Sequence, residues 1–443
     1  MFNTQPTVGI YTLGCKVNQY ESEAIAEAFI SRGFLVQSPT ASCSVYVINT
    51  CTVTAESDRK ARQFIRRAMH QNPGAFVLVT GCLAQTDPDQ IEGIGGVDFI
   101  CGNHQKMAVV DAAVRLLEGG KKATSPTILH AAPEANGFEP MQITRFDRTR
   151  AYVKIEDGCE SKCTYCIIPN ARGTIRSKPM EEVLEEVRTL IQNGCREIVL
   201  TGIETASYGK DLPNASLGAL LAEVDRIPGV GRIRLGSLDP SLMKAPFVHH
   251  ITGLSSLAPH FHLSMQSGSD AILAAMKRKY NTKMAMEGIL RLREALPDVQ
   301  LTTDIIVGFP GETEEDFAAT VDFVQKARFL MVHVFPYSKR KGTPAATMPH
   351  QIPEEEKHRR VAALSAVQNT IREQILQEQI GSTVPVLFET YKNGIAYGHT
   401  PNFIEVACPS PCPLQAMTSD VQILAVKNSR CEGRLLGELG KER

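Results

Sequence analysis

The sequence has no excess of either charge, no long apolar run and no pattern of a secretion signal. Its 47 lysines and arginines nearly balance its 48 aspartates and glutamates, which gives a net charge of −1. Overall basicity therefore does not mark a nucleic-acid-binding protein, and any contact with RNA must come from local patches. Because no run approaches the roughly 20 apolar residues of a membrane span, we expect a soluble, cytoplasmic protein without a membrane partner.

Cysteine, by contrast, is abundant, with 12 residues in a chain of 443. In a reducing compartment such a number suggests metal binding or catalysis rather than disulfide bonds. The length allows two or three domains, at the usual size of about 100–200 residues each.

Residues 1–120 alternate short β-branched runs with helical stretches. The expected strands are 8–12, 43–49, 75–80 and 97–100, and the expected helices are 18–32, 56–71 and 104–118. This alternation predicts an α/β fold with a parallel sheet. Residues 121–144 are rich in glycine, proline, alanine and threonine without periodicity, and we expect them to form a linker.

Residues 145–380 contain six further apolar runs separated by helices. The expected strands are 151–155, 197–201, 232–236, 261–265, 301–307 and 331–335, and a long polar helix follows at 354–380. Six β/α repeats predict a partial TIM-like barrel, (β/α)6, with its active site at the carboxyl ends of the strands. Residues 381–443 hold short strands separated by turn residues, which predicts a small antiparallel β-barrel.

Three cysteines, Cys159, Cys163 and Cys166, follow the first barrel strand with the spacing C-x3-C-x2-C. This short loop can hold three irons of a [4Fe–4S] cube and offers no fourth thiol, so that one iron would keep an open coordination position. The spacing is neither that of a ferredoxin nor that of a paired C-x2-C zinc ribbon. A zinc knuckle and chance clustering are the alternatives.

A second set of cysteines, Cys15, Cys51 and Cys82, follows the first three predicted strands of the N-terminal domain. In a parallel α/β sheet the loops beyond the carboxyl ends of neighbouring strands share one crevice, where ligands bind. The three residues therefore form a candidate metal site. Three buried structural cysteines and a three-thiolate zinc site are the alternatives.

Several motifs along the whole chain carry a resemblance to one family. They are TLGCKVNQYESE at 12–23, NTCTVT at 49–54, TGCLAQ at 80–85, GCESKCTYCI at 158–167, LTGIETASYG at 200–209, GSLDP at 236–240, HLSMQSGSD at 262–270, TDIIVGFPGET at 303–313 and FPYSKRKGTPAA at 335–346. With them the chain resembles the methylthiotransferases, a branch of the radical S-adenosylmethionine enzymes, from end to end. The tail resembles the TRAM domain, a small β-barrel associated with RNA binding.

The resemblance implies two [4Fe–4S] clusters and S-adenosylmethionine as cofactors. Cys159, Cys163 and Cys166 would hold the radical cluster, and Cys15, Cys51 and Cys82 the auxiliary one. One molecule of S-adenosylmethionine would supply the methyl group, and a second would be cleaved reductively with electrons from a donor such as flavodoxin or ferredoxin. Glu204, Gln266 and Ser267, which lie beyond predicted strands, and Asp304, on the fifth predicted barrel strand, are candidates to contact S-adenosylmethionine or the substrate. A solvated loop glutamate is the alternative for Glu204.

The residues around Cys15 indicate the substrate. GCKVNQYE at 14–21 resembles the branch that acts on N6-threonylcarbamoyladenosine next to the anticodon of transfer RNA. Other branches act on N6-isopentenyladenosine or on an aspartate of a ribosomal protein, and these remain alternatives. A non-enzymatic RNA-binding iron–sulfur sensor is a further alternative from another class.

Two basic patches are candidates for RNA binding. At 100° per residue, one face of the predicted helix 56–71 carries Arg59, Lys60, Arg62, Arg66 and Arg67. The second patch, Lys339, Arg340 and Lys341, follows the last barrel strand. Such groups can follow phosphates without regard to sequence, although a solvated amphipathic helix is the alternative for the first patch.

Overall fold

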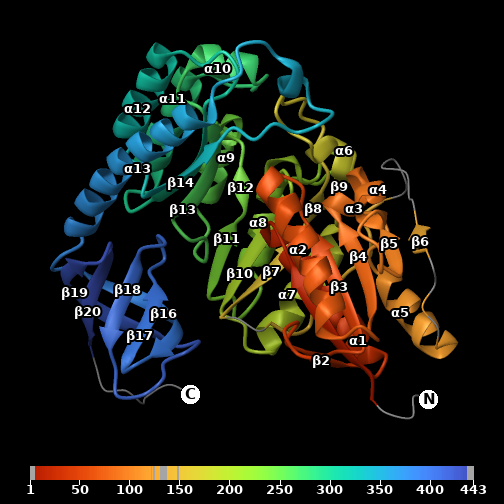
Figure 1. Ribbon diagram of the computed structural model, residues 1–443. Coiled ribbons are helices and arrows are strands. Elements are labelled where there is room, and N and C mark those ends of the chain that lie inside the picture. The colour runs from red at the N-terminus through yellow and green to blue at the C-terminus, as the bar shows by residue number, and fades with distance from the viewer. Residues whose placement is uncertain (1–4, 121, 123–124, 130–136, 147–148, 437–443) are drawn as a thin grey trace.

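The computed structural model describes residues 5–120, 122, 125–129, 137–146 and 149–436. Three units follow one another along the chain: an α/β unit, an open barrel and a small closed β-barrel that one long helix connects to the rest (Figure 1). None of the helices in the described part of the chain is both long and apolar enough to cross a membrane.

The N-terminal unit is a parallel sheet of six strands in the order β2-β1-β3-β4-β5-β6. Its strands are β1 (Thr7–Thr12), β2 (Leu35–Gln37), β3 (Val45–Thr50), β4 (Phe76–Gly81), β5 (Phe99–Cys101) and β6 (Thr127–Leu129). Its helices are α1 (Lys16–Ser31), α2 (Ala55–Gln71), α3 (Cys82–Thr86), α4 (Pro88–Glu92) and α5 (Ala108–Gly119). The predicted parallel α/β sheet is thus confirmed.

The edge strand β6 corrects the predicted linker. It lies within residues 121–144 and pairs with β5, with Phe99 opposite Thr127, so that the sheet extends beyond residue 120. A strand of three residues carries no periodicity of its own and is stabilised by the pairing, which the sequence pattern does not reveal. Residues 121, 123–124 and 130–136 of the expected linker lie outside the described part of the chain.

Helices cover both faces of this sheet. On one face α1 and α5 pack Phe29 and Val109 against Val47, and on the other α2 packs Ile65 against Ile48. Because both faces are buried, β3 and β4 are buried along their whole length. This leaves the loops at the carboxyl ends of the strands as the place for a site.

The central unit is the predicted open barrel of parallel strands. Its strands are β7 (Arg150–Lys154), β10 (Glu197–Thr201), β11 (Arg232–Leu235), β12 (Ser237–Leu238), β13 (His260–Gln266), β14 (Gln300–Val307) and β15 (Met331–Pro336), and a small hairpin is formed by β8 (Glu156–Asp157) and β9 (Arg176–Ser177). Its helices are α6 (Ile168–Arg172), α7 (Met180–Gln192), α8 (Leu217–Asp225), α9 (Ala245–Ile251), α10 (Asp270–Ala275), α11 (Thr282–Ala295), α12 (Glu314–Ala327) and α13 (Glu354–Gln377), with short 3-10 turns at η1 (Thr205–Ser207), η2 (Pro240–Leu242) and η3 (Pro344–Thr347).

All six predicted barrel strands are present, and the third is interrupted. The segment before Gly236 (β11) pairs with β10, whereas the segment after it (β12) pairs with β13. The chain therefore passes at Gly236 from a three-stranded sheet to a four-stranded sheet, and the two together form the open barrel.

The C-terminal unit is a closed five-stranded barrel in the order β16-β17-β18-β20-β19. Its strands are β16 (Thr383–Lys392), β17 (Ile395–His399), β18 (Glu405–Pro409), β19 (Thr418–Lys427) and β20 (Arg430–Leu435). The predicted small barrel is confirmed, and closure requires one parallel pair, β18 with β20, among antiparallel ones. Residues 437–443 lie outside the described part of the chain.

This small barrel closes the amino-terminal end of the central barrel. The ring of Phe403, between β17 and β18, stacks on His260 at the start of β13, with 4.6 Å between ring centroids. Arg234 of β11 donates to the carbonyl oxygen of Thr400 at 3.2 Å, and Arg150 at the start of β7 pairs with Glu389 of β16. The opposite end, where the strands terminate, is left for the cysteine loop.

The N-terminal unit docks on the central barrel through buried charges. The carboxylate of Glu21 on α1 contacts Lys154 Nζ and Arg172 Nη1, each at 2.8 Å, and it also pairs with Lys106. All four side chains are almost completely buried. Burial alone would raise the pKa of Glu21, but Arg172, Lys106 and Lys154 hold this pKa well below its usual range. The pairing therefore fixes the two units relative to each other with ionised groups.

Candidate active site at the barrel mouth

The cysteine loop begins where the chain must turn sharply after β8. Gly158 has φ +87°, and a Cβ atom there would lie 1.8 Å from the carbonyl oxygen of Thr174. Only glycine fits this position, because a side chain would collide with the backbone of the opposite segment. Further along, the N–H of Cys159 donates to Gly173 O at 3.0 Å and that of Thr164 to Met276 O at 3.1 Å, which holds the loop across the barrel mouth.

The three thiols of this loop converge on one cavity. A cavity of about 370 Å³ at the carboxyl ends of the barrel strands is lined by Cys159, Cys163 and Cys166 together with polar groups from other strands. Val53 and Thr54, just after Cys51, line the same cavity from the N-terminal unit. The volume lies in the usual range of a small-molecule site.

Charged groups touch two of the thiols. Glu204 Oε2 lies 3.2 Å from the Sγ atom of Cys159, and Arg278 Nη1 lies 3.1 Å from that of Cys163. Burial and the Glu204 carboxylate raise the pKa of Cys159 to about 12, and burial raises that of Cys166 to about 11. A metal that ionises the thiols would supply the positive charge that these buried groups lack.

The second cysteine set lies at the ends of three adjacent strands, as the topology predicts. Cys15 precedes α1, just beyond β1, while Cys51 and Cys82 directly follow β3 and β4. A Cβ at Gly14 (φ +98°) would lie 2.9 Å from the Sγ atom of Cys51, so glycine lets the first loop approach the second. Asn18 joins the same loops by donating to Leu13 O and Thr50 O at 2.7 and 2.9 Å.

The thiols of this set affect one another electrostatically. Burial raises the pKa of Cys51 to about 12, and the neighbouring Cys82 and Cys15 contribute to the shift. Desolvation by the neighbouring loops also raises the pKa of Cys15, although the residue as a whole is exposed, and Arg172 opposes that shift. Three thiols that raise one another's pKa in this way favour a bound cation that would ionise them.

Arg172 connects the two cysteine sets. It ends α6, the short helix that begins two residues after Cys166, and its Nη2 donates to Asn18 Oδ1 at 2.6 Å. Its guanidinium thus lies beside the N-terminal cysteines, and its helix directly follows the C-x3-C-x2-C loop. Arg172 therefore links the two sets, although Cys15, Cys51 and Cys82 do not line the cavity of the cysteine loop.

The spacing of the thiols fits a cluster better than a single zinc ion. Four-coordinate zinc holds its sulfurs at about 2.3 Å, which requires ligand atoms close to one another. Among the described residues, one group of three or more histidine, cysteine or acidic side chains is compact enough for a single ion, and it contains no cysteine. Neither cysteine set forms so compact a group. The residues present therefore fit a [4Fe–4S] cluster at either place.

The structure distinguishes the residues predicted to contact cofactor or substrate. Glu204, Gln266 and Asp304 line the cavity, as expected. Gln266 has φ +65°, a strained conformation for a residue with a side chain, at the point where the β13–β14 register shifts. Ser267 does not line the cavity: it is fully buried, and its Oγ lies 3.4 Å from Thr320 on α12. Its prediction is wrong, because the chain leaves β13 at Gln266 and turns the next side chain toward α12.

The basic patch on α2 forms as predicted, with Arg59, Lys60, Arg66 and Arg67 exposed. Arg62 is half-buried and donates to Gln90 at 2.7 Å, and Arg59 pairs with Glu56 of its own helix. The helix therefore offers a solvated basic face next to the barrel mouth.

The second patch is divided. Lys339 and Lys341 are exposed, but Arg340 pairs with Asp58 of α2 and also donates to Thr52 at 2.7 Å. Arg340 therefore joins the barrel to the N-terminal unit and is not available to a phosphate. Its prediction as an RNA contact is corrected, because the sequence cannot show that an acidic residue 282 positions away faces it.

Residues that the sequence reasoning missed complete the cavity. Arg278 donates to Asp239 Oδ2 at 2.9 Å and to Ser264 O at 3.1 Å, in addition to its contact with Cys163. Asp239 and Ser264 lie within the motifs GSLDP and HLSMQSGSD, which could have signalled them. Arg278 lies in the basic run KRK at 277–279, and nothing in the sequence distinguishes it from its neighbours.

Comparison with known proteins gives two family matches. Residues 153–324 match the radical SAM superfamily, and residues 7–102 match a family described as the uncharacterized protein family UPF0004. The first match covers the cysteine loop and most of the barrel. The second covers the strands and loops that carry Cys15, Cys51 and Cys82.

Relatives align over nearly the whole chain. The chain is 40% identical over 407 residues to the threonylcarbamoyladenosine tRNA methylthiotransferase MtaB of Bacillus subtilis, with 90% of each chain covered. It is 39% identical to MtaB of Thermotoga maritima, again with 90% of each chain covered. It is also 34% identical over 438 residues to the tRNA-2-methylthio-N(6)-dimethylallyladenosine synthase of Acetivibrio thermocellus, covering 96% of this chain and 90% of that one.

A solved structure shares the fold. The radical S-adenosylmethionine methyltransferase TsrM from Kitasatospora setae, with cobalamin and a [4Fe-4S] cluster bound, superposes with a TM-score of 0.56. Its sequence is 15% identical, and the match covers 77% of this chain and 74% of that one. The likeness supports the arrangement of an N-terminal α/β unit beside an open barrel.

Proposed function

This chain belongs to the radical S-adenosylmethionine methylthiotransferases, and we propose that it adds a methylthio group at C2 of N6-threonylcarbamoyladenosine in transfer RNA. The modified adenosine would be that at position 37, next to the anticodon. The printed names of relatives at 39–40% identity favour this substrate over the isopentenyl-type adenosine named for a relative at 34%. The observation that supports it is that the N-terminal unit reaches the cavity of Cys159, Cys163 and Cys166, since Val53 and Thr54, which follow Cys51, line that cavity.

Two [4Fe–4S] clusters fit the residues described above. When bound, the cluster on Cys159, Cys163 and Cys166 would supply the electron that cleaves S-adenosylmethionine, and the cluster on Cys15, Cys51 and Cys82 would supply a place for sulfur. One S-adenosylmethionine molecule would be cleaved and a second would give its methyl group. The electrons would come from a flavodoxin or ferredoxin type of donor in the cytoplasm.

The chain's own residues orient and neutralise the reactants. Arg278 places a positive charge 3.1 Å from the Cys163 sulfur and is itself held by Asp239, so it would stabilise the ionised thiolate. Glu204 presents a carboxylate to the cavity, where it can accept hydrogen bonds from the ammonium group of S-adenosylmethionine. Gln266 and Asp304 offer polar groups to ribose or substrate from neighbouring strands.

The transfer RNA would approach over the basic faces around the cavity. Lys339 and Lys341 follow β15, and the exposed arginines of α2 stand on the N-terminal unit that forms the other side of the mouth. These groups are placed to contact phosphates on either side of a base that enters the cavity.

The test is a reconstituted reaction with two substrates. The protein is loaded anaerobically with iron and sulfide and incubated with S-adenosylmethionine, reductant and transfer RNA that carries either the threonylcarbamoyl or the isopentenyl group. Nucleosides are then analysed by mass spectrometry. A methylthio mass shift confined to the threonylcarbamoyl nucleoside supports the proposal, whereas a shift confined to the isopentenyl nucleoside overturns the substrate and keeps the reaction.

A further inference from the structure

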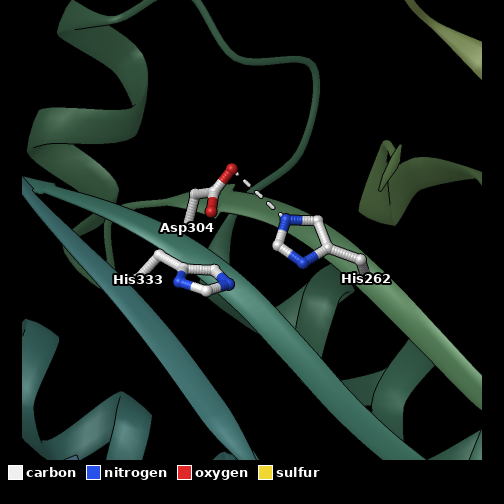
Figure 2. Close-up of side chains that lie close together, drawn as sticks. All are labelled: His262, Asp304 and His333. Carbon is white, nitrogen blue, oxygen red and sulfur yellow. Dashed lines mark ion pairs between the residues drawn. The ribbon is translucent and has the colours of Figure 1, made fainter. Parts of the chain in front are cut away.

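Three side chains on neighbouring barrel strands lie close together: His262 of β13, Asp304 of β14 and His333 of β15 (Figure 2). The register of the sheet explains the convergence. His262 lies opposite Thr302, and Asp304 lies opposite His333, so that residues two apart on β14 bring all three side chains to the same face. Asp304 also lines the substrate cavity, which places the group at its edge.

The spacing of this group suits a single metal ion. One possible ligand atom from each side chain lies within 4.8 Å of the others, and His262 Nε2 is 3.2 Å from Asp304 Oδ2. An ion with metal–ligand bonds of about 2.0–2.1 Å in tetrahedral geometry separates its ligand atoms by about 3.3 Å. The His262–Asp304 pair therefore already has the required separation. His333 is exposed, and one of its ring nitrogens lies within 4.8 Å of the other two ligand atoms.

A hydrogen bond behind His262 orients it as a ligand. Its Nδ1 lies 2.9 Å from Thr302 Oγ1, and this contact points Nε2 toward Asp304. If the Nδ1–H of a neutral His262 ring donates to Thr302, the lone pair on its Nε2 faces an oxygen of the Asp304 carboxylate. A proton on Nε2 or a metal ion must then lie between the two atoms. Metal-binding histidines commonly have such a partner on the second ring nitrogen.

We propose that His262, Asp304 and His333 bind a divalent transition-metal ion, such as zinc, with open coordination positions toward the cavity. Two histidines and one carboxylate are a ligand set for zinc and for iron(II), and three protein ligands leave room for an exogenous one. Among the described residues, it is the one group of histidine, cysteine or acidic side chains compact enough for a single ion. It contains none of the cysteines of either set. The proposal does not depend on which nucleoside is the substrate.

The surrounding charges predict a moderate affinity. Lys16, which follows Cys15 on α1, interacts electrostatically with both Asp304 and His333. Its positive charge opposes a dication, and Asp304 supplies the one negative charge among the three ligands. We therefore expect an exchangeable ion rather than a structural one.

The test is equilibrium dialysis of the anaerobically reconstituted protein against zinc, with zinc, iron and sulfide measured together by elemental analysis. We expect one zinc ion per chain beyond the iron. His333→Ala should weaken binding at least tenfold, and Thr302→Val should weaken it about 10–100-fold, as loss of a supporting hydrogen bond does elsewhere. The matched control is His358→Ala, which removes an exposed histidine from α13 and should leave binding unchanged.

X-ray absorption at the zinc edge excludes binding to free thiols. A site of imidazole and carboxylate shows only nitrogen and oxygen neighbours at about 2.0–2.2 Å, whereas cysteine gives a sulfur neighbour at about 2.3 Å. Sulfur in the spectrum, or equal zinc binding by the protein and by His333→Ala, overturns the proposal. Unchanged iron and sulfide contents show that the variants still fold around their clusters.

Discussion

The two cysteine sets are brought together in opposite ways. Cys159, Cys163 and Cys166 lie on one loop of eight residues, so the spacing along the chain already defines their chemistry. Cys15, Cys51 and Cys82 are spread over 68 positions, and only the order β1-β3-β4 in the sheet makes them neighbours. A local loop is recognised by its motif, whereas a dispersed site is recognised by topology.

The largest effect should come from removing one thiol from each set. Cys163→Ala should abolish cleavage of S-adenosylmethionine and lower the iron content from about eight to about four atoms per chain. Cys51→Ala should lower the iron content equally but keep cleavage, measured as 5′-deoxyadenosine, while methylthio transfer disappears. If both variants lose cleavage as well as methylthio transfer, the two cysteine sets do not have separate roles. Cys412→Ala, at an exposed cysteine of the C-terminal barrel, is the control that should change neither quantity.

The next effect concerns the buried contact that docks the N-terminal unit, with its cysteine set, on the central barrel. Glu21→Gln keeps the shape of the side chain but leaves Arg172, Lys106 and Lys154 without their shared carboxylate. Breaking a buried ion pair in this way should lower the free energy of unfolding by about 3–5 kcal/mol. Urea unfolding under anaerobic conditions measures it. Glu56→Gln, which removes an exposed ion pair with Arg59, should have no measurable effect.

The pH dependence of this contact has a definite sign. The pKa of Glu21 lies well below its ordinary value, because Arg172, Lys106 and Lys154 outweigh the effect of burial. The stabilisation is therefore fully present above pH about 4.5 and is lost as the pH falls through the lower, folded-state pKa. Acid unfolding of the Glu21→Gln variant should consequently depend less on pH below 4.5 than that of the natural chain. An identical dependence would contradict the role of Glu21.

Much of this arrangement was accessible from the sequence. The six barrel strands and the cysteine loop follow from runs of apolar residues and from local spacing. The crevice of Cys15, Cys51 and Cys82 follows from the alternation of strands and helices, because a parallel sheet brings its strand ends together. The glycines at 14 and 158 could have signalled tight turns but not what they approach.

Contacts between units were not accessible, because no local pattern encodes them. Arg340 belongs to a basic run that reads like a phosphate site, yet it pairs with Asp58 of another unit. Glu21, Arg172 and Lys154 come from three separate elements, and their burial shows only in three dimensions. The prediction for Ser267 fails for a local reason, since the chain leaves β13 at Gln266, whose φ is +65°, and turns the next side chain toward α12. Side-chain partners far apart in sequence are thus the part that the structure adds.

A smaller effect tests the role of the Glu204 carboxylate, which lies beside Cys159. Glu204→Gln should weaken binding of S-adenosylmethionine about 10–100-fold, since a hydrogen bond to a charged group contributes about 1.5–3 kcal/mol. Equilibrium dialysis of the reconstituted protein measures the affinity, and the cluster absorbance must stay constant. Glu160→Gln, at an exposed neighbour within the same loop, is the matched control. Equal affinities for the two variants would indicate that Glu204 is a solvated loop residue.

The smallest effect concerns the basic surface of α2, near Cys51. Arg66 and Arg67 are exposed on α2, which follows the Cys51 loop, and reversing both charges should weaken transfer-RNA binding severalfold. If both arginines contact phosphates, the slope of log affinity against log salt should fall by about 1–2, because each contact contributes about 0.7–0.9. Lys326→Glu on α12 reverses an exposed charge elsewhere on the barrel and should leave the slope unchanged. Weaker binding with an unchanged slope would mean that α2 acts only through the docking of the N-terminal unit. In that case Arg340→Gln, which breaks the contact with Asp58, should reproduce the defect, since it loosens the same docking without removing an exposed charge.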